Sequence, residues 1–211
     1  MGAGPADERK FVTVIFVDLV GSTRLASQID PERYREVLTR YYRMVAEELE
    51  SLRGRAYNFA GDAVVGVFGL QHTHDDDALR AVRAGLGLVD RVGRLGEEIG
   101  LPVPLRIRVG IHTGPVAIGT EASEQGLLYG ATVNMAARLQ QAADPGTVLV
   151  SETSYLLSLS QVQYGPMREV EANPGEARVG GQELAQLVEI DLEPLAHQTR
   201  DGRGREGVHV G

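Results

Sequence analysis

The chain has 211 residues, a formal net charge of -8 at pH 7 and no cysteine. It is long enough for one sizeable hydrophobic core, and an acidic chain lacks the surplus cations that nucleic-acid binding needs, so we expect no nucleic-acid partner. The absence of cysteine excludes disulfides and thiolate zinc sites and favours a cytoplasmic location. No apolar run reaches the ~20 residues that would cross a bilayer, so we expect no membrane partner either.

The segment of residues 11–24 contains the first candidate site. Its residues from Val12 to Val17 are β-branched or aromatic, which predicts a buried strand. Asp18 follows at the end of this strand, and a loop over Leu19–Thr23 contains a glycine that lets backbone amides approach an anion closely. A carboxylate for a hard cation beside amides for phosphate could hold a metal–nucleotide, but Asp18 could equally be only a cap of the turn.

An amphipathic helix is predicted from Asp30 to about Gly54. The sequence Asp-Pro-Glu at residues 30–32 is typical of a helix start, and apolar residues recur at three- and four-residue spacing from Tyr34 to Leu52.

A hairpin is predicted next, with strands over Arg55–Phe59 and Val64–Phe68 around a turn that contains Asp62. Taken alone, closure of the hairpin is the simpler interpretation of this aspartate. If the hairpin lies beside the first strand, however, Asp18 and Asp62 come together. Two carboxylates so close repel each other unless a cation neutralises them, so their adjacency would imply a metal site.

The middle of the chain predicts a helix and two strands. The acidic segment His72–Asp77 has no recognised metal-ligand spacing, and we interpret it as the solvated start of a helix over residues 78–92. A strand over 105–111, a turn at His112–Pro115 and a further strand from residue 116 follow. The histidine of the turn is interpreted as a hydrogen-bonding residue rather than a general base, since the sequence shows no partner acid nearby.

A third helix begins at Gly130 and contains Asn134 and Arg138. These two residues are four apart, so they project from the same face. An amide beside a guanidinium could hold a ribose oxygen and a phosphate, although an ordinary surface pair is the simpler alternative. Beyond this helix we expect a strand over 147–150, a brief helix over 151–157, two strands before Ile190 joined by a polar loop over 171–181, and a linker from residue 191.

Four motifs occur in order along the chain: FVDLVGST, FAGDAVVGVFG, RVGIHTGPVAIG and YGATVNMAARL. Together they resemble the class III nucleotidyl cyclase catalytic domain of the adenylate and guanylate cyclases. The resemblance implies an α+β fold, with a ferredoxin-like βαββαβ core and a central, mainly antiparallel sheet flanked by helices. It implies a tail over 1–9, a catalytic domain over 10–190 and a linker over 191–211 toward a downstream domain. The segment His74–Ala84 is similar to bacterial cyclases fused to an ATPase and helical-repeat regulator.

The resemblance also assigns roles to residues. Asp18 and Asp62, with the backbone of Leu19, match the ligands of two divalent cations, Mg²⁺ or Mn²⁺. Asn134 matches the residue that orients the ribose, and Arg138 the residue that stabilises the transition state. The amides that match the phosphate cradle belong to Leu19, Val20, Gly21, Ser22 and Thr23. The implied activity is a signalling lyase that converts a nucleoside triphosphate, ATP first, to its cyclic monophosphate at the interface of a head-to-tail homodimer.

Three positions depart from the family pattern. Asn58 stands where a lysine usually contacts the purine, and Leu127 stands at the position of its polar partner. A lysine for the triphosphate is missing near the final strands, where Arg178 is the nearest basic residue. The base specificity therefore stays open. The alternative function is a catalytically weak or silent nucleotide-binding and dimerisation module that regulates a fused domain.

Overall fold

The computed structural model describes residues 8–118, 128–165, 167–169 and 186–189. The predicted polar loop over 171–181, the linker from residue 191 and most of the predicted tail over 1–9 lie outside these ranges. The elements, in chain order, are β1 (Glu8–Leu19), α1 (Ser22–Gln28), α2 (Pro31–Ser51), β2 (Arg55–Ala60), β3 (Ala63–Phe68), α3 (Asp77–Glu98), β4 (Ile107–Ile118), β5 (Leu128–Tyr129), α4 (Ala131–Ala142), β6 (Val148–Val150), α5 (Glu152–Ser158), a 3-10 turn (Leu159–Gln161), β7 (Met167–Glu169) and β8 (Gln186–Glu189).

A ferredoxin-like βαββαβ core is formed by the elements from β1 to β4, as predicted. The sheet has the strand order β2-β3-β1-β4-β6-β8-β7, with β5 paired to β4 beside this path. Strand β1 lies at the centre and pairs antiparallel with both β3 and β4. Among the described strands, the β4–β6 pair is the parallel one, so the sheet is mainly antiparallel.

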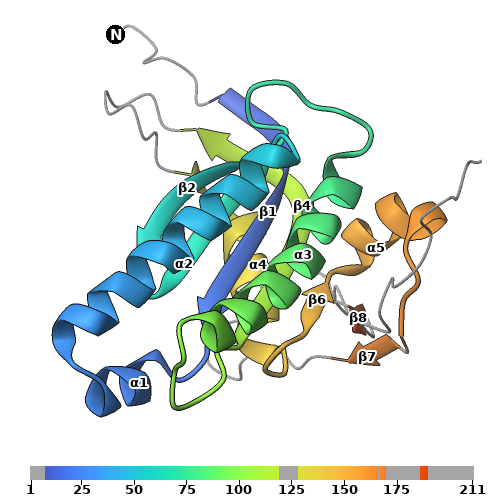
Figure 1. The fold of residues 1–211 in the computed structure, drawn as a ribbon. Coiled ribbons are helices and arrows are strands. Elements are labelled where there is room, and N and C mark those ends of the chain that lie inside the picture. The colour runs from blue at the N-terminus through green and yellow to red at the C-terminus, as the bar shows by residue number, and fades with distance from the viewer. Residues whose placement is uncertain (1–7, 119–127, 166, 170–185, 190–211) are drawn as a thin grey trace, which may run out of the picture.

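Helices cover both faces of this sheet (Figure 1). Alternate residues of β1 point to opposite faces, and both sets are apolar, so the strand is buried on both sides. Ile15 and Val17 belong to the larger core cluster with α2 and α3. Val12 and Val14 belong to a second cluster that includes Ala136 of α4. Asp18 is an even number of residues from Val12 and Val14, so its side chain faces the same side of the sheet, the side covered by α4.

The predicted start of α2 is confirmed. The Asp30 side chain caps the helix by accepting a hydrogen bond from the backbone nitrogen of Glu32 at 2.8 Å, and Pro31 is the first helical residue. The helix ends at Ser51, three residues before the predicted glycine. Helix α1, of seven residues, was not predicted. No helix in the described part of the chain is both long enough and apolar enough to cross a membrane.

The predicted turn at residues 112–115 is wrong, because β4 continues through it to Ile118. A proline is tolerated inside this strand because one edge of the strand is partly free. Strand β6 pairs with β4 only as far as Ile111, and β5 pairs from Ala117. Pro115 lies between these two pairings, opposite Phe11 of β1. A missing N–H group therefore costs little at this position.

The acidic start of α3 agrees with the prediction only in part, because residues 72–76 are exposed but Asp77 is buried. Asp77 is 6% exposed rather than solvated, and it forms a buried ion pair with Arg80, which is also 6% exposed. The carboxylate of Asp77 accepts a further hydrogen bond from the backbone nitrogen of His74 at 2.8 Å. A buried charge requires such partners. Asp77 therefore has a structural role, in which it holds the loop before α3.

Candidate functional site

Two aspartates lie side by side at one end of the central strands. The register pairs Asp18 of β1 with Ala63 of β3, and Asp62 directly precedes Ala63. This confirms the condition under which the sequence predicted a pair of carboxylates. The pKa of Asp18 is raised, first by burial and then by the negative charge of Asp62, and Arg108 and Gln140 partly offset this effect.

Two further side chains hold the carboxylate of Asp18. Arg108 of β4 donates from Nη2 to Oδ2 at 3.1 Å, and Gln140 of α4 donates from Nε2 to the same oxygen at 3.0 Å. Neither contact was predicted from the sequence. Arg108 faces Asp18 directly in the β1–β4 register, so strand pairing is the signal that would have identified it. Its buried Nε has no hydrogen-bond partner among the described residues.

Two successive tyrosines of α2 contact the backbone just before each aspartate. Tyr41 donates its hydroxyl to the carbonyl oxygen of Val17 at 3.4 Å, and Tyr42 donates its hydroxyl to the carbonyl oxygen of Gly61. Burial raises the pKa of Tyr41 well above its usual value, and the charges of Asp18 and Asp62 raise it further. Helix α2 thus holds both the end of β1 and the β2–β3 turn, and with them the spacing of the two carboxylates.

We expect Tyr42→Phe to loosen the turn that carries Asp62. The substitution removes one hydrogen bond and keeps the aromatic ring, which packs edge-on against Phe59 with the ring centroids 5.3 Å apart. The free energy of unfolding should fall by about 0.5–1.5 kcal/mol, and the affinity for Mn²⁺ should fall severalfold. Urea unfolding and Mn²⁺ titration measure the two effects. Tyr34→Phe on the same helix is the control, and an equal loss in both variants would contradict this role of Tyr42.

The residues present fit a divalent cation. Carboxylate oxygens are the ligands that Mg²⁺ and Mn²⁺ prefer, and the charge of a cation would relieve the repulsion that raises the pKa of Asp18. Within the described residues there is no group of three or more His, Cys, Asp or Glu side chains that could hold a metal ion. The two aspartates would therefore need backbone or substrate oxygens to complete the coordination, as is usual for Mg²⁺ bound with a phosphate substrate.

The predicted phosphate cradle is shorter than expected. Leu19 is buried at the end of β1, and the backbone nitrogen of Val20 donates to the carbonyl oxygen of Arg106 at 2.8 Å. Gly21 turns the chain with a φ of 72°, a conformation that favours glycine, and α1 begins at Ser22 rather than after the loop. The hydroxyl of Ser22 donates to Asp62. The amide of Val20 is therefore already engaged, and a phosphate-binding role of the amides from Gly21 to Thr23 stays a prediction.

Asn134 and Arg138 share one face of α4, as predicted, but this face is directed away from Asp18. Successive helical residues are rotated by about 100°, so Arg138 lies about 200° around the helix from Gln140. Gln140 is 6% exposed and contacts Asp18, whereas Asn134 is exposed. The structure therefore separates these two residues from the aspartates of the same chain.

The positions linked to base recognition are described only in part. Asn58 is exposed on β2 and pairs with Val65 of β3 next to an irregularity in the strand register. Val65 belongs to the core cluster on the α4 side, so Asn58 points to the face of the sheet that carries Asp18. Leu127 and Arg178 lie outside the described residues.

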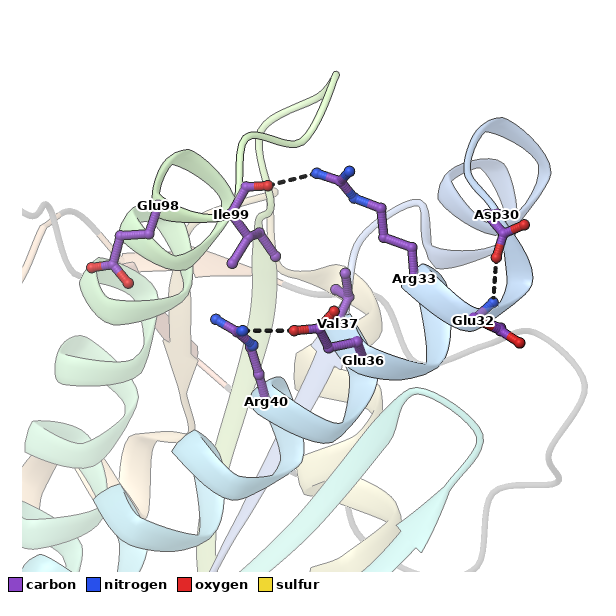
Figure 2. Close-up of a pocket in the computed structure, with 8 residues that line it drawn as sticks. All are labelled: Asp30, Glu32, Arg33, Glu36, Val37, Arg40, Glu98 and Ile99. Carbon is purple, nitrogen blue, oxygen red and sulfur yellow. Dashed lines mark hydrogen bonds and ion pairs between the residues drawn. The ribbon is translucent and has the colours of Figure 1, made fainter.

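A pocket of about 700 Å³ lies between the start of α2 and the end of α3 (Figure 2). Its charged side chains are largely engaged with neighbouring groups. Arg40 pairs with Glu36 at 2.6 Å, and Arg33 donates to the carbonyl oxygen of Ile99 at 2.7 Å. These are exposed contacts of low energy, and the pocket does not contain Asp18 or Asp62. It is therefore a surface groove rather than the candidate active site.

Comparison with known proteins identifies the family. The model of the "Adenylate and Guanylate cyclase catalytic domain" matches residues 5–185. The chain belongs to the class III adenylate and guanylate cyclase catalytic domain family. An uncharacterised protein of Rhizobium meliloti (strain 1021) is 40% identical over 149 residues, which are 69% of this chain and 14% of that protein. Adenylate cyclase 1 of the same strain is 29% identical over 177 residues, which are 80% of this chain and 26% of that cyclase.

Solved cyclase structures share the fold of this cyclase domain. The adenylyl cyclase CyaB of P. aeruginosa has a TM-score of 0.79 and 27% identity, over 89% of this chain and 96% of that structure. The guanylyl cyclase Cya2 has a TM-score of 0.75 and 27% identity, over 88% of this chain and 92% of that structure. One is an adenylyl and the other a guanylyl cyclase at equal identity, so the likeness leaves the choice of base open.

Proposed function

We propose that the chain is a catalytic domain that converts a nucleoside triphosphate, with ATP as the first candidate, to the 3′,5′-cyclic monophosphate and pyrophosphate. The observation that carries this proposal is the adjacency of Asp18 and Asp62 at the paired ends of β1 and β3. Membership of the cyclase family supports the reaction type. An adenylyl cyclase among the similar structures supports ATP as the first substrate to test.

The side chains of the site have distinct roles in this reaction. The ribose 3′-oxygen forms a bond to the α-phosphorus, the bond to the bridging oxygen of the leaving group breaks, pyrophosphate departs and the hydroxyl proton passes to solvent. Two cations, Mg²⁺ or Mn²⁺, held by Asp18, Asp62 and the Leu19 carbonyl, would activate the hydroxyl and neutralise the triphosphate. Asn134 orients the ribose, and Arg138 stabilises charge that develops on the α-phosphoryl oxygens.

The arrangement of α4 supports a homodimer with composite sites. Gln140 points toward Asp18 of its own chain, and Arg138 points about 200° away around the helix. One chain therefore does not place Arg138 beside its own aspartates. In a symmetric head-to-tail pair, each site takes the aspartates from one chain and Asn134 and Arg138 from the other, and the pair contains two equivalent sites.

Base selection is assigned to Asn58 and Leu127 as part of this proposal. The amide of Asn58 can both donate and accept hydrogen bonds, and its position on the α4 side of the sheet is compatible with a base edge. Replacing a charged or paired contact by a neutral amide should weaken discrimination between bases by about 1–3 kcal/mol. Three further points stay predictions. They are triphosphate binding by Arg178, fusion to an ATPase and helical-repeat regulator, and a cytoplasmic location.

Product analysis by mass spectrometry tests the proposed function. The protein at high concentration with Mn²⁺ receives ATP, GTP, CTP and UTP in competition, and its mass in solution is measured by light scattering. We expect one cyclic nucleotide as the main product. The matched control is Arg138→Ala, which should lower the rate by about 10²–10³.

Each result has a separate meaning. Cyclic AMP that depends on Arg138 supports an adenylate cyclase, and another cyclic nucleotide corrects the choice of ATP. A dimer that binds Mn²⁺ and ATP but forms no cyclic nucleotide contradicts the reaction. That outcome supports the alternative of a silent nucleotide-binding and dimerisation module.

A further inference from the structure

Gln140 is a buried amide for which the sequence suggested no role. Its side chain is 6% exposed, and its Nε2 donates to Oδ2 of Asp18 at 3.0 Å across 122 positions of the sequence. A buried amide is costly without a partner, and a hydrogen bond to a charged acceptor is among the stronger ones in proteins. The contact therefore stabilises one orientation of the Asp18 carboxylate.

The contact leaves one oxygen of Asp18 for a cation. Arg108 also donates to Oδ2, at 3.1 Å, so both side-chain donors found among the described residues use the same oxygen. A cation can therefore bind Oδ1 without displacing Gln140. Donors of this kind orient a metal ligand and increase its affinity, and their loss typically lowers affinity about 10–100-fold.

Gln140 also lies where the backbone of α4 comes very close to the sheet. A Cβ atom at Gly110 of β4 would overlap with the backbone nitrogen of Gln140 and the carbonyl oxygen of Ala136. The helix backbone at Gln140 thus lies directly against the β4 backbone, with little space for sliding or tilting. Gln140 therefore holds the Asp18 carboxylate from a firmly packed helix rather than from a loop.

We propose that Gln140 is a positioning residue that joins the Asp18 carboxylate to the helix that carries Asn134 and Arg138. This inference rests on the proposed function, in which the two ends of the link serve different sites of one dimer. Asp18 binds a cation in one site, while Arg138 of the same chain acts in the other. One side chain thus contributes both to cation binding at the first site and to the placement of Arg138 at the second.

The first test needs no turnover. Gln140→Met keeps the approximate volume of the side chain and removes the donor, and Mn²⁺ binding is measured by electron paramagnetic resonance. We expect the dissociation constant to rise about tenfold, as is typical when a donor to a metal ligand is lost. The control is Gln141→Met, since Gln141 is exposed on the same helix. Equal Mn²⁺ affinity in both variants overturns the proposal, whether or not the protein is a cyclase.

A second measurement separates positioning from general stability. The thermal midpoints of Gln140→Met and Asp18→Asn, alone and combined, form a double-mutant cycle in metal-free buffer. If Gln140 acts through Asp18, its substitution should change the midpoint less when residue 18 is already asparagine. Full additivity of the two shifts overturns the proposed link, even where both single variants are less stable.

This contribution to both sites is tested in mixed dimers with one working site. One chain carries Arg138→Ala and supplies the aspartates, while the other carries Asp62→Ala and supplies Asn134 and Arg138. Gln140→Met is then placed on either chain. We expect the rate to fall about tenfold when it is on the first chain, through Asp18, and severalfold when it is on the second, through α4. No loss on the second chain overturns the contribution to the placement of Arg138.

Discussion

Mixing Asp62→Ala protein with Arg138→Ala protein should restore cyclic nucleotide formation that neither protein shows alone. Each variant destroys both sites of its own homodimer, because every composite site contains one copy of each residue. A mixed dimer keeps one intact site. Random exchange gives half mixed dimers, so the recovered rate should be about one quarter of the wild-type rate per chain. Product formation after mixing at several ratios measures the effect.

The control for this experiment is a mixture of Asp18→Ala with Asp62→Ala. Both substitutions affect the same half of the site, so no combination of these chains contains an intact pair of aspartates. The mixture should stay inactive. Recovery in the control, or none in the Asp62 and Arg138 mixture although mixed dimers form, would contradict the head-to-tail arrangement.

Gly110→Ala should be among the most destabilising single substitutions in the chain. The added methyl group would overlap with the backbone of α4 at Gln140 and Ala136, and a backbone cannot move aside as a flexible side chain can. The helix would have to separate from β4. We expect the free energy of unfolding to fall by about 3 kcal/mol or more, at the upper end for overpacked sites. Chemical denaturation measures this loss.

Two glycines of α3 provide matched controls. A Cβ atom at Gly85 would meet only side-chain carbons, with Val109 Cγ1 at 3.2 Å, so Gly85→Ala should have a much smaller effect than Gly110→Ala. Gly93 has no atom within 4 Å of this position, and Gly93→Ala should stabilise the helix by about 1 kcal/mol. Equal losses at Gly85 and Gly110 would refute the close approach of α4 as the cause.

Local sequence patterns predicted the elements that determine the fold. The hairpin around Asp62 was identifiable because two short apolar runs flank a turn sequence, and the start of α2 was identifiable from its cap and proline. The prediction of a turn at residues 112–115 was wrong. It was made because the sequence Thr-Gly-Pro is typical of turns, whereas here it lies inside a strand. Whether proline is tolerated in a strand depends on the neighbouring strand, which ends its pairing at Ile111. A local pattern does not contain that information.

Some residues of the candidate site could be predicted from local sequence, and others could not. Asp18 and Asp62 could be proposed from the sequence because Asp18 ends an apolar strand and Asp62 lies in the turn between two such strands. Their adjacency depended on the pairing of β1 with β3, which the structure confirms. The contacts of Arg108 and Gln140 with Asp18 could not be proposed, because they join residues 90 and 122 positions apart. These contacts depend on strand register and on helix packing. They are tertiary contacts, which local sequence patterns do not predict.

The central position of β1 also has a consequence for biosynthesis. This strand is translated before both of its partners, β3 and β4, and the last of the partner residues is Ile118. At the usual pace of translation, the strand waits roughly 5–20 s for its second partner to be synthesised. During this interval its apolar residues and one unpaired edge are open to other chains. Slow, non-local folding and a need for protection on the ribosome are therefore expected from the topology itself.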